Sequence, residues 1–281
     1  MEPKIIADSS CDLTPAMRNV LRIEIASLKI TSGGVEFIDD ETIDIKALIA
    51  SMKANSTPIS TACPSPDDYV QLMNKADECF VITLSSKLSG SYNSACVARD
   101  MVLEAHPDKK IFVVDSESAA AGELRLALLL REWIGAGLPF EEICEKITAF
   151  SAKMCTLFVL DTLDNLIKNG RISKMAGMIG TMLNLRPLMG EDGHGEILAL
   201  EKIRGTQNAL RRLVEMVAEK TAAAAAGSIT LVLSYCNCPE RANDLKKEFI
   251  AKCAALKEVI IVPTSGLSTA YASDGGVIVA F

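Results

Sequence analysis

Three apolar segments in the first half of the chain each end in hydroxyl or carboxyl side chains and then run into a predicted helix. If these segments are parallel strands, their carboxyl ends share one edge of the sheet, where open α/β proteins bind ligands. Amides at helix N-termini and serine hydroxyls together favour a small anion there. Ordinary capping of helices by serine and aspartate is the alternative. The segments are IIADSS (5–10), VITLSS (81–86) and VVDSES (113–118).

The residues needed for common catalytic sites are few. A serine hydrolase needs a base, yet the two histidines, His106 and His194, both fall in predicted surface turns, and the sequence has no G-x-S-x-G elbow. It also has no G-x-x-x-x-G-K-[ST] loop and no G-x-G-x-x-G after a strand. Asp8 or Asp115 at the strand edge could serve a phosphatase or transferase that acts on a small anion. The inventory favours binding over catalysis, so we assign no catalytic residue.

Composition and charge limit the partners of the chain. The 281 residues carry a net charge of −7 and contain no run of Lys and Arg, which argues against a nucleic-acid-binding surface. The first residues lack the pattern of a signal peptide, and the apolar runs are far shorter than the roughly 20 residues of a membrane span. We expect a cytoplasmic protein with at most transient membrane contact.

The nine cysteines are expected to be reduced thiols, most of them buried. Cys236 and Cys238 form the sequence CNC, but no second pair of Cys or His lies at zinc-finger spacing. We therefore predict no metal site and no cofactor.

Strand and helix signals alternate through the first half, which predicts a parallel sheet with helices on both faces. Asp12 or Thr14 is a suitable N-cap for the first helix, and Ser65 for the third. The predicted strands span residues 4–8, 24–31, 79–84 and 110–115, and the predicted helices span 12–22, 39–54, 66–76, 91–105 and 117–137.

The second half differs in character from about residue 150. Turn residues in EDGHG predict a hairpin over 190–203, and Gly170 is a candidate C-cap. We predict an α/β protein of two domains, a parallel-sheet α/β/α domain over 1–150 and an α/β domain with a mixed sheet over 151–281. The other predicted elements of the second half are a strand at 155–161, a helix running into a strand at 177–189, a helix at 206–226, a strand at 228–236, a helix at 239–253 and a strand at 258–262.

Six segments distributed over the whole chain, and in the same order, resemble the motifs of the DegV family of bacterial lipid-binding proteins. That family includes the fatty-acid-binding subunit of fatty acid kinase. Any one segment is only moderately specific, whereas six in order are specific. The segments are IIADSSCDLTP (5–15), STACPSP (60–66), ITLSSKLSGSYNSA (82–95), VVDSESAAAGE (113–123), DTLDNLIKNGRIS to NLRPLM (161–189) and EKIRGTQNAL (201–210).

The resemblance implies that one long-chain fatty acid is buried in a tunnel between the domains. The loops of 1–150 would hold its carboxylate, and 151–281 would cover the acyl chain. Burying about sixteen carbons at ~0.8 kcal/mol per methylene gives on the order of 10 kcal/mol gross, so the hydrocarbon anchors the ligand and hydroxyls orient it. The protein would present the carboxylate to a partner kinase without being an enzyme itself. The implied carboxylate contacts in the first domain are Thr61, Ser86, Ser89 and Gly90.

The C-terminal segment STAYASDGGVIVAF departs from the family pattern. Tyr271 occupies the position of a family histidine that touches the carboxylate, although a shift of one residue would place Ala272 there. A tyrosine donates a hydrogen bond but carries no positive charge near neutral pH. Cys63 replaces a family Gln, and Asn169 replaces a Gly. These departures bear on the head-group end of the site.

Two arginines have both a local and a functional interpretation. Arg171 follows a predicted helix C-terminus, where a basic residue often bonds the last carbonyls. Its alternative is a contact with a partner or near the domain interface. Arg204 matches a family arginine associated with docking to the kinase, and its alternative is a solvated turn before a helix. Both are candidate partner-binding residues.

Overall fold

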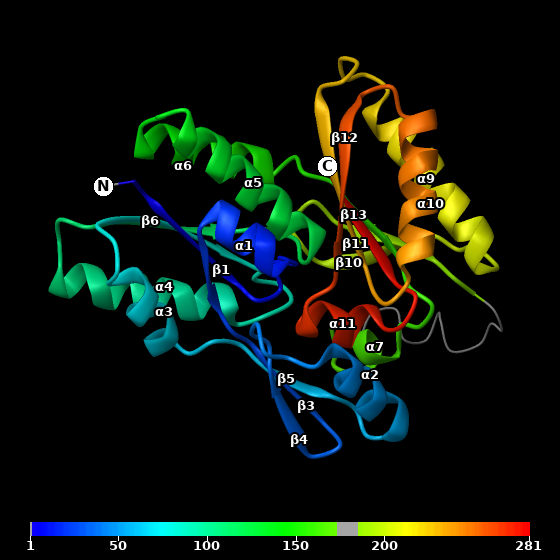
Figure 1. Ribbon diagram of the computed structural model, residues 1–281, viewed down its shortest axis with the longest axis horizontal. Helices are drawn as coiled ribbons and strands as arrows, with labels where there is room; N and C mark the ends of the chain where they lie inside the picture. The colour runs from blue at the N-terminus through cyan, green and yellow to red at the C-terminus, as the bar shows by residue number, and fades with distance from the viewer. Residues whose placement is uncertain (1, 173–184) are drawn as a thin grey trace.

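Three sheets organise the computed structural model, which describes residues 2–172 and 185–281 (Figure 1). The first sheet is entirely parallel and has the strand order β2-β1-β6-β7. The carboxyl ends of β1, β6 and β7 therefore lie at one edge, as the sequence predicted. The strands of this sheet are β1 (Lys4–Asp8), β2 (Ile23–Ala26), β6 (Glu78–Thr83) and β7 (Lys110–Asp115).

Helices cover both faces of this parallel sheet. Alternate residues of a strand point to opposite faces, so Ile5 and Ala7 pack with Leu124 of α5, whereas Ile6 packs with Tyr69 of α3. Figure 1 shows α5 and α6 on one side of the sheet and α3 and α4 on the other. The first-half helices are α1 (Pro15–Leu21), α2 (Ile45–Ala54), α3 (Pro66–Met73), α4 (Ser91–Ala105), α5 (Ala121–Gly135) and α6 (Phe140–Ser151).

The second large sheet is mixed, with the order β10-β9-β8-β13-β11-β12. Strands β11 and β12 are parallel and the other neighbours are antiparallel. The predicted fold class, a parallel-sheet part followed by a mixed-sheet part, is confirmed. The strands are β8 (Thr156–Val159), β9 (Leu188–Glu191), β10 (Ile197–Glu201), β11 (Ile229–Tyr235), β12 (Leu256–Pro263) and β13 (Val277–Ala280).

The helices of the second half cover one face of this sheet and one of its ends. Helices α9 and α10 pack their apolar sides against β8, β11, β12 and β13. Helix α5 packs on β11 and β13, where Val232 and Ala280 join the same core as Ile5 and Phe80. Helix α5 is therefore shared by both large sheets. The helices are α7 (Asp164–Lys168), α9 (Thr206–Thr221), α10 (Pro239–Lys252) and α11 (Gly266–Ala272).

A small third sheet was not predicted. It is antiparallel, with the order β4-β3-β5, formed by β3 (Lys29–Ser32), β4 (Val35–Ile38) and β5 (Ser60–Ala62). The single strand predicted over 24–31 is wrong, because the chain leaves the parallel sheet after Ala26. The Leu28 amide donates to Ser9 Oγ at 3.0 Å, and this bond turns the chain into the new sheet.

Several local predictions can be compared with the structure. Thr14 accepts from the Met17 amide at 3.2 Å and caps α1, and Ser65 forms a capping box with Asp68 at the start of α3. The hairpin over 190–203 is present as β9 and β10. Gly170 follows the C-cap of α7 with a φ of 75°, a conformation that favours glycine. The helix predicted from residue 177 lies mostly outside the described residues.

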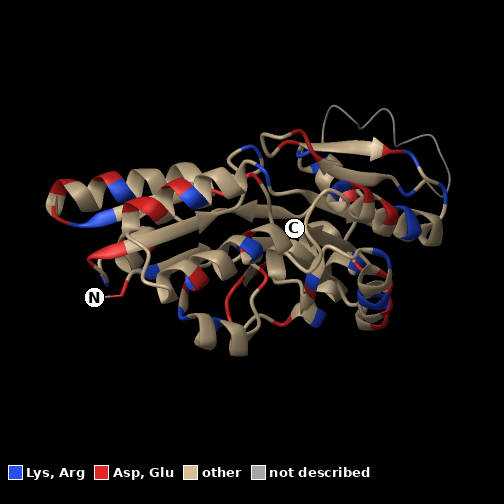
Figure 2. Ribbon diagram, turned by 90° about the horizontal axis from the view of Figure 1, so that it is seen from above, with Lys and Arg blue, Asp and Glu red and all other residues tan. Residues whose placement is uncertain are grey.

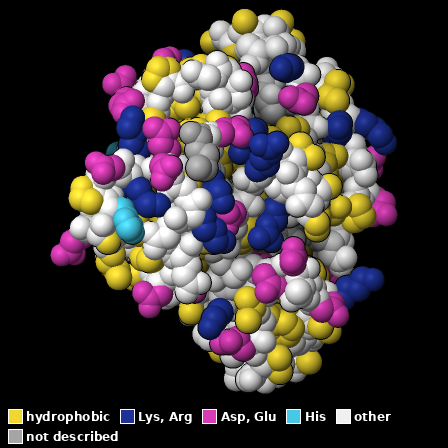
Figure 3. Space-filling model, turned by 60° about the vertical axis from the view of Figure 1, so that its left-hand side comes forward, with side chains coloured by type: hydrophobic (Ala, Val, Ile, Leu, Met, Phe, Trp, Pro, Cys, Tyr) yellow, Lys and Arg dark blue, Asp and Glu magenta, His cyan; other side chains and the backbone are white. Residues whose placement is uncertain are grey.

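Charged residues lie mainly on the helices and loops, and the middle parts of the strands are mostly uncharged (Figure 2). On the face seen in Figure 3, Lys and Arg side chains gather around a central hollow, with Asp and Glu side chains among them. Among residues 2–172 and 185–281, no helix is long and apolar enough to cross a membrane.

Candidate ligand-binding cavity

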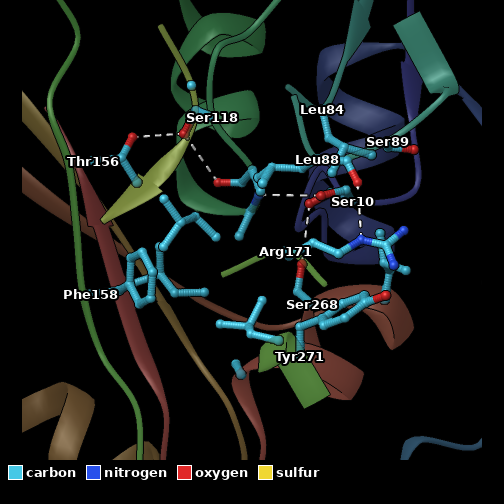
Figure 4. Close-up of a pocket in the computed structure, with 18 of the residues that line it drawn as sticks. Ser10, Leu84, Leu88, Ser89, Ser118, Thr156, Phe158, Arg171, Ser268 and Tyr271 are labelled. Carbon is cyan, nitrogen blue, oxygen red and sulfur yellow. Dashed lines mark hydrogen bonds between the residues drawn. The ribbon is translucent and has the colours of Figure 1, made fainter. Parts of the chain in front are cut away.

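A cavity lies where the carboxyl edge of the parallel sheet meets the mixed sheet and α11 (Figure 4). With its mouth it holds about 880 Å³ of space free of protein atoms. This space includes solvent at the opening of the cavity. Most of its wall is apolar, formed by Leu28, Leu84, Leu88, Phe158, Leu160, Leu166, Ile197, Leu267 and Ile278.

The loops after the three predicted strand ends all reach this cavity. Ser10 comes from the loop after β1, Ser89 from the loop after β6, and Ser118 from the loop after β7. The parallel topology places these loops side by side, because β1, β6 and β7 are neighbours in the sheet. The edge identified from the sequence is thus a wall of the cavity.

Two hydroxyls and a cation meet at the polar part of the wall. Thr61 Oγ1 and Tyr271 Oη are 3.0 Å apart and hydrogen bonded. The Arg171 guanidinium lies over the Tyr271 ring, 5.7 Å from its centroid. Its Nε donates to the Leu88 carbonyl at 3.2 Å (Figure 4). Its Nη1 donates to the Asn169 carbonyl at 2.7 Å. Among the described residues, no carboxylate forms an ion pair with Arg171.

The four residues predicted in the first-domain loops separate into two pairs. Thr61 and Ser89 line the cavity. Ser86 and Gly90 are exposed and do not line it. The Ser86 amide instead donates to Asp115 Oδ1 at 3.1 Å. A sequence of closely spaced serines does not indicate which hydroxyl faces inward.

The two candidate partner-binding arginines lie in different surroundings. Arg171 is half-buried in the cavity wall, and its bond to the Asn169 carbonyl shows that the local, helix-end interpretation also holds. Arg204 is exposed in the turn before α9 and lies outside the lining of the cavity.

The Asp8 carboxyl group is buried behind the cavity wall, with 0% of the residue exposed. It accepts from the Ser10 amide at 3.1 Å, the Leu84 amide at 2.9 Å and Ser91 Oγ at 2.5 Å. Burial raises the pKa of Asp8 in spite of these bonds. Asp8 thus holds the ends of β1 and β6 together and has no surface that a ligand could reach.

Asp115 and Glu123 also lack a catalytic setting. Asp115 Oδ1 accepts from the amides of Ser86 and Glu117, both at 3.1 Å, and Asp115 does not line the cavity. Burial, and then the charge of Asp8, raise the pKa of Glu123 well above its ordinary value. Within the part of the chain that the structure describes, no group of three or more His, Cys, Asp or Glu could hold a metal ion.

Sequence reasoning missed some polar residues of the wall. Ser118 Oγ and Thr156 Oγ1 are 2.7 Å apart and hydrogen bonded, on the side of the cavity away from Arg171 (Figure 4). Ser268 on α11 donates to the Ser10 carbonyl at 3.4 Å. The sequence signal for Ser118 was its place in VVDSES, whereas Thr156 and Ser268 had no signal of their own.

The fold and the cavity together define an α/β protein with a mostly apolar internal cavity, whose charged lining residues are Arg171, Glu117 and Glu191 in the part of the chain that the structure describes. The chain belongs to the DegV family, because the profile described as the DegV family of uncharacterised proteins matches residues 2–281. The family indicated by the six segments is therefore confirmed. A DegV domain-containing protein of Streptococcus pneumoniae is 36% identical over 280 residues, which are 99% of this chain and 98% of that protein.

Two similar solved structures contain fatty acids. A DegV family protein from Ruminococcus gnavus, refined with vaccenic acid, has a TM-score of 0.93 and 36% identity, with 100% of both chains covered. The fatty acid kinase (Fak) B3 protein of Streptococcus pneumoniae, loaded with linoleic acid, has a TM-score of 0.91 and 34% identity, with 100% of this chain and 99% of that chain covered.

Proposed function

We propose that this protein binds one long-chain fatty acid in the cavity, with its carboxylate at the polar mouth and its chain among the apolar side chains. The observation that carries this proposal is the position of Arg171 beside the hydroxyls of Thr61 and Tyr271, at the edge of an apolar cavity. The fatty acids bound to the similar R. gnavus and S. pneumoniae proteins support it.

The apolar wall supplies most of the binding free energy. Each methylene that leaves water contributes ~0.8 kcal/mol, so a chain of about sixteen carbons contributes on the order of 10 kcal/mol gross. Loss of ligand freedom offsets several kcal/mol of this gain. The polar residues then determine which end of the ligand sits at the mouth.

The carboxylate is held by donors that are already in place. Thr61 Oγ1 and Tyr271 Oη bond to each other in this structure, and both can turn their hydrogens toward an anion. Ser89 Oγ accepts from the Ser91 amide at 3.2 Å, which leaves the hydroxyl hydrogen of Ser89 for a ligand. Arg171 supplies the positive charge that Tyr271 cannot carry. Hydrogen bonds to a charged group contribute about 1.5–3 kcal/mol each.

The bound carboxylate is presented to a separate kinase for phosphorylation. The similarity to the Fak B3 protein supports this use. Arg204 is exposed and makes no ion pair among the described residues, so its charge is available to the kinase. A cytoplasmic location follows from this use. The earlier alternative, a small-anion enzyme that uses Asp8 or Asp115, has no observation in its favour, because neither carboxylate lines the cavity.

Mass spectrometry of lipid extracted from the purified protein tests fatty-acid binding. We expect about one fatty acid per chain. An empty cavity in protein that also hydrolyses a phosphate ester would contradict the proposal.

A matched pair of variants tests the two arginines. Arg171→Met should weaken fatty-acid affinity by about 10- to 100-fold through loss of a charge-assisted contact. Arg204→Met should leave affinity unchanged and slow phosphorylation by a fatty acid kinase. The reverse pattern would show that the two roles are exchanged.

A further inference from the structure

A buried carboxylate from the N-terminal half holds the first turn of α11. Asp39 follows β4 and is only 3% exposed. Its Oδ1 accepts from the Gly266 amide at 2.7 Å, and its Oδ2 accepts from the Leu267 amide at 2.9 Å. Its own amide donates to the Leu28 carbonyl at 2.9 Å, which fixes the turn in place. More than 220 residues of sequence separate the carboxylate from the two amides.

Helix α11 forms one wall of the cavity and part of its mouth. It contributes Leu267, Ser268, Tyr271 and Ala272 to the lining. Thr61, which meets Tyr271 at the mouth, lies on β5 in the same small sheet as β4. The Asp39 contact therefore joins the sheet that carries Thr61 to the helix that carries Tyr271.

We propose that Asp39 is a positioning residue for fatty-acid binding, which fixes α11 against the small sheet so that Thr61 and Tyr271 meet at the head group. This inference rests on the proposed function of the cavity. The close approach requires glycine at position 266, since a Cβ there would lie 2.4 Å from Ile43 Cδ1 and 2.6 Å from Asp39 Oδ1. Loss of the carboxylate leaves two buried amides without acceptors.

The surroundings of Asp39 give the contact a pH dependence of defined sign. Burial raises the pKa of Asp39 to about 7, the amides of α11 and the Ser9 hydroxyl lower it, and the neighbouring Asp12 raises it further. Asp12 itself accepts from the Ser265 amide at 2.8 Å, and Ile43 is the apolar neighbour. If α11 detaches, water reaches Asp39 and its pKa returns toward 3.8. Attachment thus takes up a proton, and detachment is favoured as the pH rises.

The release rate of a fluorescent C18 fatty acid tests this proposal at pH 6 and pH 8. For the wild type we expect release about tenfold faster at pH 8, the ratio set by a pKa near 7 in the attached state. Asp39→Asn keeps the shape but places an amide NH2 against a backbone N–H. The Asp39→Asn variant should release the fatty acid at least tenfold faster than the wild type at pH 6. Its release rates at pH 8 and pH 6 should be nearly equal. Asp40→Asn changes a neighbouring carboxylate that accepts from the amide and the hydroxyl of Thr42, and it should behave as wild type.

A second variant keeps the charge and changes only the fit. Gly266→Ala should also speed release at pH 6, because the new methyl group pushes α11 away from Asp39. If Asp39→Asn does not fold, two other measurements test the proposal. These are the release rate of Gly266→Ala and the ratio of the wild-type release rates at pH 8 and pH 6. Wild-type release rates in both Asp39→Asn and Gly266→Ala would overturn the inference while fatty-acid binding stands. A wild-type protein that takes up no fatty acid would instead overturn the proposed function.

Discussion

Two buried carboxyls and three hydroxyls at the carboxyl edge of the parallel sheet have different positions. Ser10, Ser89 and Ser118 line the cavity, together with Glu117, whereas Asp8 and Glu123 are buried behind its wall. A buried carboxylate can accept several amide hydrogen bonds and so hold two strand ends together, as Asp8 does. A hydroxyl is neutral and can donate to the ligand. The same short motif, a strand ending in Asp and Ser, therefore divides into a structural half and a ligand-facing half.

Removal of the most connected buried carboxylate should have the largest effect on folding. Asp8→Ala leaves two amides and the Ser91 hydroxyl without their acceptor, and it should lower the free energy of unfolding by on the order of 3 kcal/mol. Urea denaturation measures this. Asp115→Ala, which affects two amides at a half-buried site, should lower the free energy of unfolding by a smaller amount. A loss below 1 kcal/mol for Asp8→Ala would mean that the buried carboxylates are not structural.

The buried carboxyls also predict how stability depends on pH. The pKa of Asp39 is raised from 3.8 to about 7 in the folded state, so the folded protein holds a proton that the unfolded chain releases. Stability from this group is complete below pH 4 and is lost as the pH rises to about 7. Asp39 alone should lower the free energy of unfolding by about 2 kcal/mol between pH 5.5 and pH 8. Asp39→Asn should reduce the measured difference by about this amount and leave the part due to Asp8, Asp12 and Glu123, whose pKa values are also raised by burial. An unchanged difference would assign the whole effect to those other groups.

The ligand-facing half should affect binding and leave folding nearly unchanged. Ser89→Ala should weaken fatty-acid affinity by about tenfold, and Thr61→Ala combined with Ser89→Ala by about 100-fold, with each hydroxyl contributing 1–2 kcal/mol. Titration calorimetry measures both. Ser86→Ala removes an exposed hydroxyl of the same loop and should bind as wild type. Wild-type affinity in Ser89→Ala and in the double variant, as in Ser86→Ala, would show that the fatty-acid carboxylate binds elsewhere.

The smallest expected effect is that of Tyr271→Phe. This change removes the hydroxyl that bonds Thr61 but keeps the ring beneath Arg171. Affinity should fall by about three- to tenfold, the value of one hydrogen bond. Titration calorimetry with the fatty acid measures the affinity of this variant. A much larger loss would show that Tyr271 rather than Arg171 is the main head-group contact.

The sequence predicted the features that depend on local pattern. Alternation of strand and helix signals gave the parallel sheet, and the serines after β6 identified the edge that forms the cavity wall. It could not show which of Ser86 and Ser89 faces inward, since that depends on the path of a short loop. The small third sheet was missed because the break near Leu28 depends on a bond to Ser9, which lies 19 residues away.

Contacts between distant parts of the chain were the least predictable. Arg171 resembled a helix-end residue, and only the folded chain brings it over Tyr271. Asp39 was included in the acidic start of a predicted helix over 39–54, whereas α2 begins at Ile45. Its hydrogen-bond partners lie near the other end of the sequence. No local pattern records such a pairing.

The shared position of α5 has a consequence for how the protein unfolds. Its apolar side chains belong to one core that includes Phe80 of the first sheet and Val232 and Val262 of the second. A chain cut near residue 150 would leave α5 with bare apolar surface where the second sheet had been. We therefore expect the two halves of the protein to unfold as a single cooperative unit, so that the walls of the cavity form and are lost together.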